Sequence, residues 1–120
     1  MSQDCIRIQN MHFYGYHGVD ASERELGGRF AMDVELRRDL SEAGRTDDLT
    51  KTVDYKQVYD LVSRLQSERS FQLLEALAEA VAAAILQQFE VEEVVVRARK
   101  QSVPLGGLID YTEVEIRRQT

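Results

Sequence analysis

The chain has 120 residues, of which 43% are hydrophobic and 30% charged, and its formal net charge is -6 at pH 7. A chain of this length can bury one hydrophobic core, so we expect residues 1–120 to form a single domain, and the acidic balance argues against nucleic acid as a partner. No stretch is long and apolar enough to cross a membrane, and the single cysteine, Cys5, excludes an internal disulfide, so we expect a cytoplasmic protein without a membrane partner.

The first predicted strand covers residues 5–14, in which Ile6 and Ile8 alternate with polar side chains. The run Tyr14-Gly15-Tyr16-His17-Gly18 interrupts it, because its two glycines release the backbone for a tight turn or for close approach to a ligand. Residues 23–28 are mostly polar and end in two glycines, which indicates a short helical turn or a loop.

A second strand is predicted over residues 30–40, followed by a polar connection over residues 41–52. The connection contains Gly44 and few apolar residues, which predicts a segment on the surface. The strand has the alternation of a sheet with one buried face, because its apolar side chains share one side: Phe30, Met32, Val34 and Leu36.

Two helices are predicted next. Asp54 is a suitable N-cap, with Gln57 in the capping-box position, and apolar residues recur at helical spacing over residues 55–66. Ser70 can cap the second helix in the same way. The apolar positions of that helix keep the helical spacing through a run of strong helix formers: Leu74, Leu77, Ala78, Val81, Ile85 and Phe89.

A third strand is predicted over residues 94–100, and it ends on a residue that is unusual for its position. Val94, Val96 and Ala98 point to one face, and Lys100 continues this apolar row. Such a lysine either extends its ammonium past the rim of the core, or it is a partly desolvated amine whose lowered pKa suits a base near neutral pH.

A loop over residues 102–107, which holds the one proline, Pro104, precedes a last strand over residues 111–118. Two strands, two helices and two strands predict an α+β fold, a four-stranded antiparallel sheet with two antiparallel helices packed on one face. Such a sheet has two open edges, so we expect a symmetric homo-oligomer that pairs them.

Three further side chains could carry chemistry, although each also has an ordinary structural explanation. Tyr55 would lie in the first turn of its helix, where a tyrosine commonly packs with its hydroxyl at the rim. Glu75 would lie in the first turn of the second helix, where the helix dipole favours a carboxylate, and Glu23 would be a loop carboxylate. The two histidines are too few for a recognisable metal site, so we expect neither a metal nor a cofactor.

A series of short runs, in order along the chain, together resembles the dihydroneopterin aldolase family. These are Phe13 to Gly18 (FYGYHG), Glu23-Arg24 with Gly27, Thr46 to Asp48, Thr52 to Tyr55 (TVDY), Leu73 to Glu75 (LLE), Lys100 with Pro104 and Gly106, and Val114 to Arg117. Many members have proline directly after the lysine, whereas Gln101 follows Lys100 in this chain.

The resemblance implies the tunnelling fold (T-fold), which agrees with the predicted sheet and helices. It also implies assembly side by side into a tetrameric ring, or into two stacked rings that form an octamer, with active sites between subunits. The implied reaction is the metal-free retro-aldol cleavage of the pterin 7,8-dihydroneopterin, in folate biosynthesis, to 6-hydroxymethyl-7,8-dihydropterin and glycolaldehyde. The N5=C6 imine of the substrate accepts the electrons, so the enzyme needs acid-base groups and a pterin clamp.

The match of motifs also implies roles for individual residues. Lys100 would be the acid-base group, and Tyr55 would assist proton transfer. Glu75 would accept two hydrogen bonds from the 2-amino and N3–H edge of the pterin, and Glu23 would hold the hydroxylated side chain or a catalytic water. The residues implied to bind substrate are Glu23, Val53, Tyr55, Leu74 and Glu75.

Other functions stay open at this point. The chain could mainly epimerise dihydroneopterin at C2'. Aldol cleavage is reversible, and re-addition of the aldehyde on its other face inverts that carbon. An epimerase that acts on the triphosphate would need a basic pocket, against which the acidic balance argues. A pterin-binding module without catalysis is the remaining alternative, since the zinc-dependent tunnelling enzymes need a histidine cluster that two histidines cannot supply.

Overall fold

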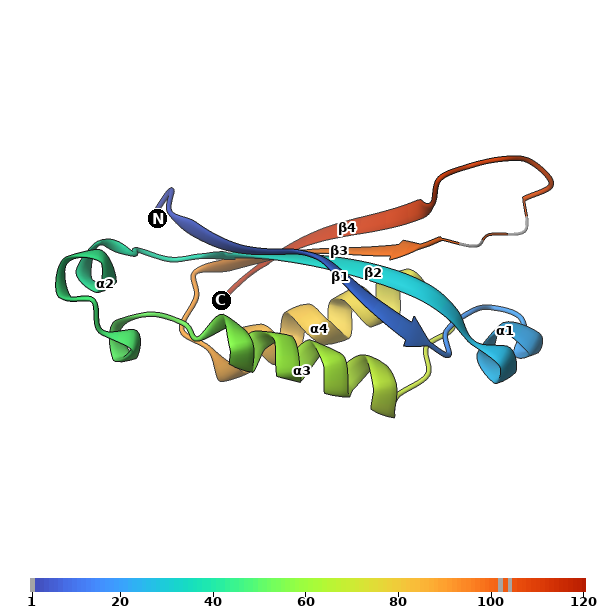
Figure 1. Cartoon of the computed structure of the whole chain (residues 1–120), viewed down its shortest axis with the longest axis horizontal. Helices are drawn as coiled ribbons and strands as arrows, with labels where there is room; N and C mark the ends of the chain where they lie inside the picture. Colours follow the sequence, from blue (N-terminus) through green and yellow to red (C-terminus); the bar gives the residue numbers. More distant parts are fainter. Residues whose placement is uncertain (1, 102, 104) are drawn as a thin grey trace.

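In a computed structural model, residues 2–101, 103 and 105–120 are described, so Ser102 and Pro104 of the predicted loop lie outside the described residues. Four strands form one antiparallel sheet in the order β1-β2-β3-β4 (Figure 1). The strands are β1 (Cys5–Gly15), β2 (Gly28–Arg37), β3 (Glu93–Lys100) and β4 (Thr112–Gln119).

Two antiparallel helices, α3 (Tyr55–Glu68) and α4 (Leu74–Gln88), cover one face of this sheet (Figure 1). Helix α4 packs on β3 and β4, and α3 packs on β1. The predicted α+β fold is therefore confirmed. Its core consists of the apolar rows that the alternation predicted, together with the inner faces of the helices: Met32, Val34, Leu36, Val58, Val62, Leu77, Val81, Ile85, Val94, Val96 and Ala98.

Strand β1 contains a bulge that the sequence did not reveal. Asn10 has a left-handed backbone with a φ of 61°, and the pairing with β2 shifts between Ile8 and Met11. The Asn10 N–H donates to the Asp33 carboxylate at 2.7 Å, which fixes the bulge. As a result the inward row moves from even to odd positions, so that Met11 and Phe13 join the core.

The connection between β2 and α3 lies on the surface, as predicted, and it contains short helical segments that the sequence pattern did not indicate. It contains the short helix α2 (Ser41–Thr46) and a 3-10 turn, η1 (Leu49–Lys51). Strand β2 also ends at Arg37 rather than at residue 40, because the next residue leaves the sheet to bridge two loops. The Arg38 guanidinium donates to the Glu90 carbonyl at 3.1 Å and to the Lys51 carbonyl at 3.0 Å.

The two predicted helix caps have different outcomes. Asp54 caps α3 as expected, since its carboxylate accepts from the Lys56 N–H at 3.0 Å. The prediction that Ser70 caps the second helix is wrong, because α4 begins at Leu74 with Leu73 as its N-cap residue. The Ser70 hydroxyl instead donates to the Tyr16 carbonyl in the loop after β1.

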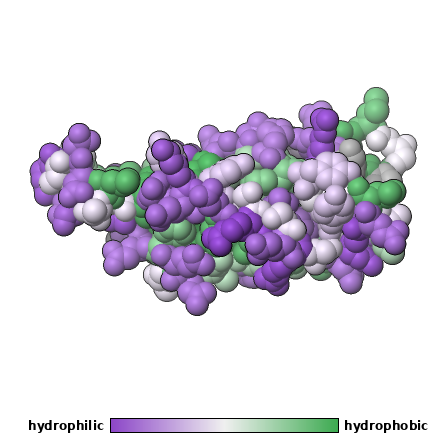
Figure 2. Space-filling model, turned by 60° about the horizontal axis from the view of Figure 1, so that its bottom comes forward, coloured by the Kyte–Doolittle hydropathy of each residue, from purple (hydrophilic) through white to green (hydrophobic). Residues whose placement is uncertain are grey.

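Hydrophilic side chains cover most of the face shown in Figure 2, and hydrophobic ones show at several places, including the end near the loop between β3 and β4. Exposed apolar residues of that loop include Leu105, Leu108 and Ile109. Within the described residues, no helix is long and apolar enough to span a membrane.

Candidate active site

A cavity of about 280 Å³ opens where the loop between β1 and the short helix α1 (Ala21–Leu26), the end of β3 and the start of α4 meet. Four of the six predicted site residues line it: Glu23, Leu74, Glu75 and Lys100. These residues come from three separate segments of the chain, so the cavity exists only in the folded protein.

Lys100 is the last residue of β3 and lies opposite Phe30 of β2. Its side chain is 16% exposed and forms an ion pair with the Glu23 carboxylate. Burial lowers the pKa of Lys100, and the nearby Asp20 carboxylate opposes this effect. The ammonium does not extend past the rim into solvent, so the structure favours a partly desolvated amine.

Glu23 is held by the short helix α1 (Ala21–Leu26). Its Oε1 accepts a hydrogen bond from the Asp20 N–H at 3.2 Å, and its Oε2 pairs with Lys100. Gly18 packs closely against this side chain, since a Cβ on Gly18 would lie 2.5 Å from the Glu23 Cβ. Gly18 therefore makes the room that lets Glu23 reach Lys100.

Leu74 and Glu75 are the first two residues of α4. Leu74 is half-buried and packs against the core, whereas Glu75 is exposed to solvent at the cavity. The positive end of the helix dipole stabilises a carboxylate at this position. Glu75 thus places a carboxylate beside the same cavity as Lys100.

Val53 and Tyr55 lie at the other end of the molecule. Val53 is buried and lines a separate cavity of about 370 Å³ next to Gln88 and Phe89, while Tyr55 is 59% exposed in the first turn of α3. Because α3 and α4 are antiparallel, the start of α3 lies beside the end of α4, far from Lys100 (Figure 1). A single chain does not bring the six predicted residues together.

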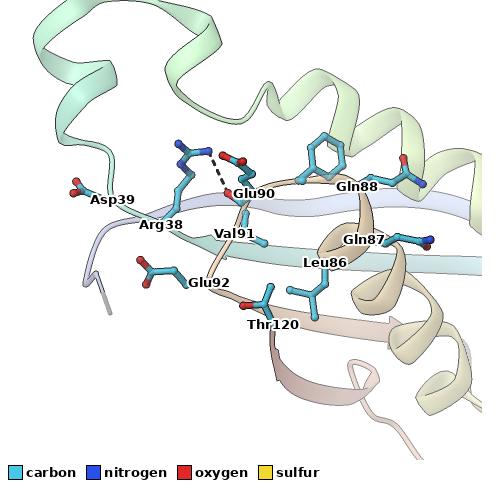
Figure 3. A pocket seen from close by; sticks show the side chains of 10 residues that line it. Arg38, Asp39, Leu86, Gln87, Gln88, Glu90, Val91, Glu92 and Thr120 are labelled. Carbon is cyan, nitrogen blue, oxygen red and sulfur yellow. Dashed lines mark hydrogen bonds between the residues drawn. The ribbon is translucent and has the colours of Figure 1, made fainter.

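A larger hollow, about 650 Å³, surrounds the end of α4 and contains none of the predicted site residues (Figure 3). It shares Arg38, Gln88, Phe89 and Glu90 with the cavity that Val53 lines. The Arg38 guanidinium points to the Glu90 carbonyl across this hollow (Figure 3). Its second contact, to the Lys51 carbonyl, ties down the turn that precedes Val53.

The Lys100 cavity is also lined by residues that were not predicted as site residues, and two of them lie close to Lys100. Phe30 lies under the Lys100 ammonium, with Nζ 6.0 Å from the ring centroid, and His17 lines the wall beside it. His17 belongs to the FYGYHG run, so its place in a motif was the available signal. Within the part of the chain that the structure describes, no group of three or more His, Cys, Asp or Glu residues could hold a metal ion.

The chain is similar to one family over nearly its whole length. The family model described as "FolB: Dihydroneopterin aldolase" matches residues 6–117. The dihydroneopterin aldolase of Bacillus subtilis is 37% identical over 117 residues, which cover 97% of this chain and 98% of that protein. The dihydroneopterin aldolase of Staphylococcus epidermidis is 42% identical over 118 residues, which cover 97% of both. A crystal structure of a FolB protein from Vibrio cholerae has a TM-score of 0.92 at 29% identity and covers 100% of both chains.

Proposed function

The chain belongs to the dihydroneopterin aldolase family, and on that premise we propose how its residues cleave 7,8-dihydroneopterin into 6-hydroxymethyl-7,8-dihydropterin and glycolaldehyde in folate biosynthesis. The observation that carries the proposal is the pairing of Lys100 with Glu23 in a cavity that Glu75 also lines. An amine with a lowered pKa is a base at the place where a small molecule fits, and a carboxylate lies beside it.

The reaction needs one proton removed and one returned. As a free amine, Lys100 takes the proton of the C2' hydroxyl, directly or through one water. The C1'–C2' bond then breaks, C2' leaves as the aldehyde carbon of glycolaldehyde, and the electron pair forms a C1'=C6 double bond. Electrons of the former imine pass to N5, which is protonated, so the substrate supplies its own electron sink without a metal. A proton on C1' and the loss of the N5 proton complete the product, and Tyr55 assists these transfers.

The pterin ring is held by the start of α4. The Glu75 carboxylate accepts two hydrogen bonds from the 2-amino group and N3–H, a bidentate fit that a carboxylate makes well. Leu74 packs beside the ring, and Glu23 holds the hydroxylated side chain or the catalytic water. This orientation puts the cleaved bond next to Lys100.

The complete site forms between neighbouring chains. Val53 and Tyr55 lie far from Lys100 within one chain, and strands β1 and β4 each have one partner strand among the described residues. Pairing of these open edges makes a tetrameric ring, or two stacked rings, in which Tyr55 of one chain reaches the Lys100 cavity of the next.

The proposal also covers the domain organisation and the cellular location. Residues 1–120 act as one domain, which is supported by one hydrophobic core to which all four strands and both long helices contribute. A cytoplasmic location is supported by the single cysteine, Cys5, which needs no oxidising compartment.

The test is product analysis under nitrogen with 7,8-dihydroneopterin as substrate, with and without EDTA. We expect hydroxymethyl-dihydropterin and glycolaldehyde in equal amounts, insensitive to EDTA and lost in Lys100→Ala. The matched control is Lys51→Ala, an exposed lysine that pairs with Glu42. Formation of the C2' epimer alone would make the protein an epimerase, and pterin binding without any turnover would make it a binding module.

A further inference from the structure

We propose that His17 is a positioning residue for pterin binding, because its imidazole joins the loop after β1 to the segment that leads into α4. Through this segment it sets where Leu74 and Glu75 lie on the cavity wall. The inference rests on the proposed function, since it takes Glu75 as the acceptor for the pterin edge.

Three hydrogen bonds connect the loop after β1 to the segment before α4. The Phe71 N–H donates to His17 Nδ1 at 3.1 Å, the Gly18 N–H donates to the Phe71 carbonyl at 2.9 Å, and the Ser70 hydroxyl donates to the Tyr16 carbonyl. The histidine contact is the one that uses a buried side chain. Since Nδ1 accepts a hydrogen bond, the ring proton of the neutral imidazole is on Nε2.

The other side of the ring faces helix α3. His17 Nε2 and Gln66 Oε1 are both buried, and neither has a well-aligned hydrogen-bond partner among the described residues. Both atoms lie close to Gly15, where an added Cβ would lie 2.7 Å from Nε2 and 2.9 Å from Oε1. The Nε2 side of the ring therefore lies near the Gln66 side chain in the last turn of α3, and Gly15 leaves the space for both groups.

The surroundings keep the imidazole fixed and neutral. His17 is 2% exposed, and its ring lies against Phe30 with centroids 5.0 Å apart and against Phe71 with centroids 5.6 Å apart. Burial lowers the pKa of His17, the neighbouring Gln66 opposes this, and the positive charge of Lys100 lowers it further. The ring must be neutral here, because a protonated Nδ1 is a donor and could not accept the hydrogen bond from the Phe71 N–H.

Nδ1 accepts from the Phe71 N–H and Nε2 is buried from solvent, so neither nitrogen is available to exchange protons with the substrate. The imidazole instead holds the Phe71 backbone, three residues before the N-terminus of α4. We therefore expect loss of His17 to weaken pterin binding while the chemical step is largely kept. This split between KM and kcat distinguishes positioning from acid-base catalysis.

The experiment replaces His17 with two amide side chains of different length. In His17→Asn the side-chain oxygen takes the place of Nδ1 and still accepts from the Phe71 N–H, whereas in His17→Gln the amide extends past that position. We expect His17→Gln to raise KM, and the Kd of neopterin measured by fluorescence, about tenfold relative to His17→Asn, which corresponds to one hydrogen bond. The value of kcat is expected to stay within about threefold in both variants.

The control is His12→Asn, a change of the exposed histidine on β1, which is expected to keep wild-type KM. Equal KM and Kd values in His17→Asn and His17→Gln would overturn the inference, as would a loss of kcat at unchanged KM. Both variants keep a polar side chain, and comparing their melting temperatures with that of the wild-type protein tests whether they fold. Neopterin binding reports on His17 even without turnover, so an inactive wild-type protein would refute the proposed function and leave this comparison decisive.

Discussion

Lys100, at the end of β3, forms an ion pair with Glu23 of α1, whose other carboxylate oxygen accepts a hydrogen bond from the Asp20 N–H. The backbone of α1 thereby fixes the direction of the Glu23 side chain, and Gly18 gives it the space to approach. A helix of only six residues thus positions the carboxylate that pairs with the base, Lys100.

The first prediction concerns the pH dependence of kcat/KM. Lys100 is active as the free amine, so kcat/KM rises with pH as the amine loses its proton. Because the pKa of Lys100 is lowered, we expect the midpoint of this rise, the acid limb of the profile, below the ordinary lysine pKa of 10.5. In Glu23→Gln the carboxylate no longer stabilises the ammonium, so the pKa of Lys100 falls further and the limb moves to lower pH. Initial rates across the pH range measure this, and a limb that moves to higher pH would contradict it.

The second prediction concerns the glycine in the loop after β1. In Gly18→Ala the new methyl group would lie 2.5 Å from the Glu23 Cβ, so α1 must shift and the carboxylate must leave Lys100. We expect kcat/KM to fall by about tenfold or more, as for other small misplacements of reacting groups.

Gly44→Ala is the matched control for this change. Nothing lies within 4 Å of a Cβ at Gly44, which is part of helix α2. The control is expected to keep full activity and to gain up to about 1 kcal/mol of stability from its higher helix propensity. Equal activity of Gly18→Ala and Gly44→Ala would show that the approach at Gly18 is unnecessary.

The third prediction concerns the composition of the site. We propose that each site takes Lys100 from one chain and Tyr55 from its neighbour. Lys100→Ala and Tyr55→Phe then each inactivate a site through a different one of its two chains. Unfolding and refolding an equal mixture of the two variants would then produce intact sites, and random assembly gives about one quarter of wild-type activity. A mixture no more active than its components would mean that each chain supplies its own site.

The fourth prediction concerns the sheet face opposite the helices. The Asp33 carboxylate accepts from Arg99 at 2.7 Å with both oxygens, and both side chains are buried. In Asp33→Ala the buried Arg99 keeps Glu113 as an ionic partner at 2.8 Å but loses two hydrogen bonds, so we expect the free energy of unfolding to fall by about 2 kcal/mol. Urea titration measures this value, and a loss below about 1 kcal/mol would contradict it.

The same ion pair predicts how stability depends on pH. The hydrogen bonds from Arg99 lower the pKa of Asp33 in the folded protein, an effect that burial partly opposes. The contribution to stability is therefore complete above the ordinary value of 3.8 and is lost as the pH falls through the lowered value. Asp33→Ala is expected to lack this part of the acid dependence.

The sequence predicted those parts of the fold that depend on local patterns. Alternation identified the inward rows of β2 and β3, and the cap at Asp54 identified the start of α3. The bulge at Asn10 was missed because it depends on Asp33, a residue of the neighbouring strand. Ser70 was misassigned for the same kind of reason, since its hydroxyl bonds to Tyr16, which is remote in the sequence.

The candidate site was predicted from motifs rather than from geometry. Lys100 was noticeable as a lysine in an apolar row, and the cavity brings it together with Glu23, Leu74 and Glu75. His17 was not recognised as a site residue, because its burial between two phenylalanines follows from tertiary packing. Motif order also could not reveal that the start of α3, which holds Tyr55, lies at the opposite end of the fold from the end of β3, which holds Lys100.

The most direct test of the proposed base is the rate at which Lys100→Ala releases glycolaldehyde, measured with and without added ethylamine. We expect kcat to fall by about 10² to 10⁴, the usual contribution of a general base, and to recover partly with ethylamine, because a small amine can enter the vacated space. Release at the wild-type rate without added amine would contradict the assignment of Lys100 as the base.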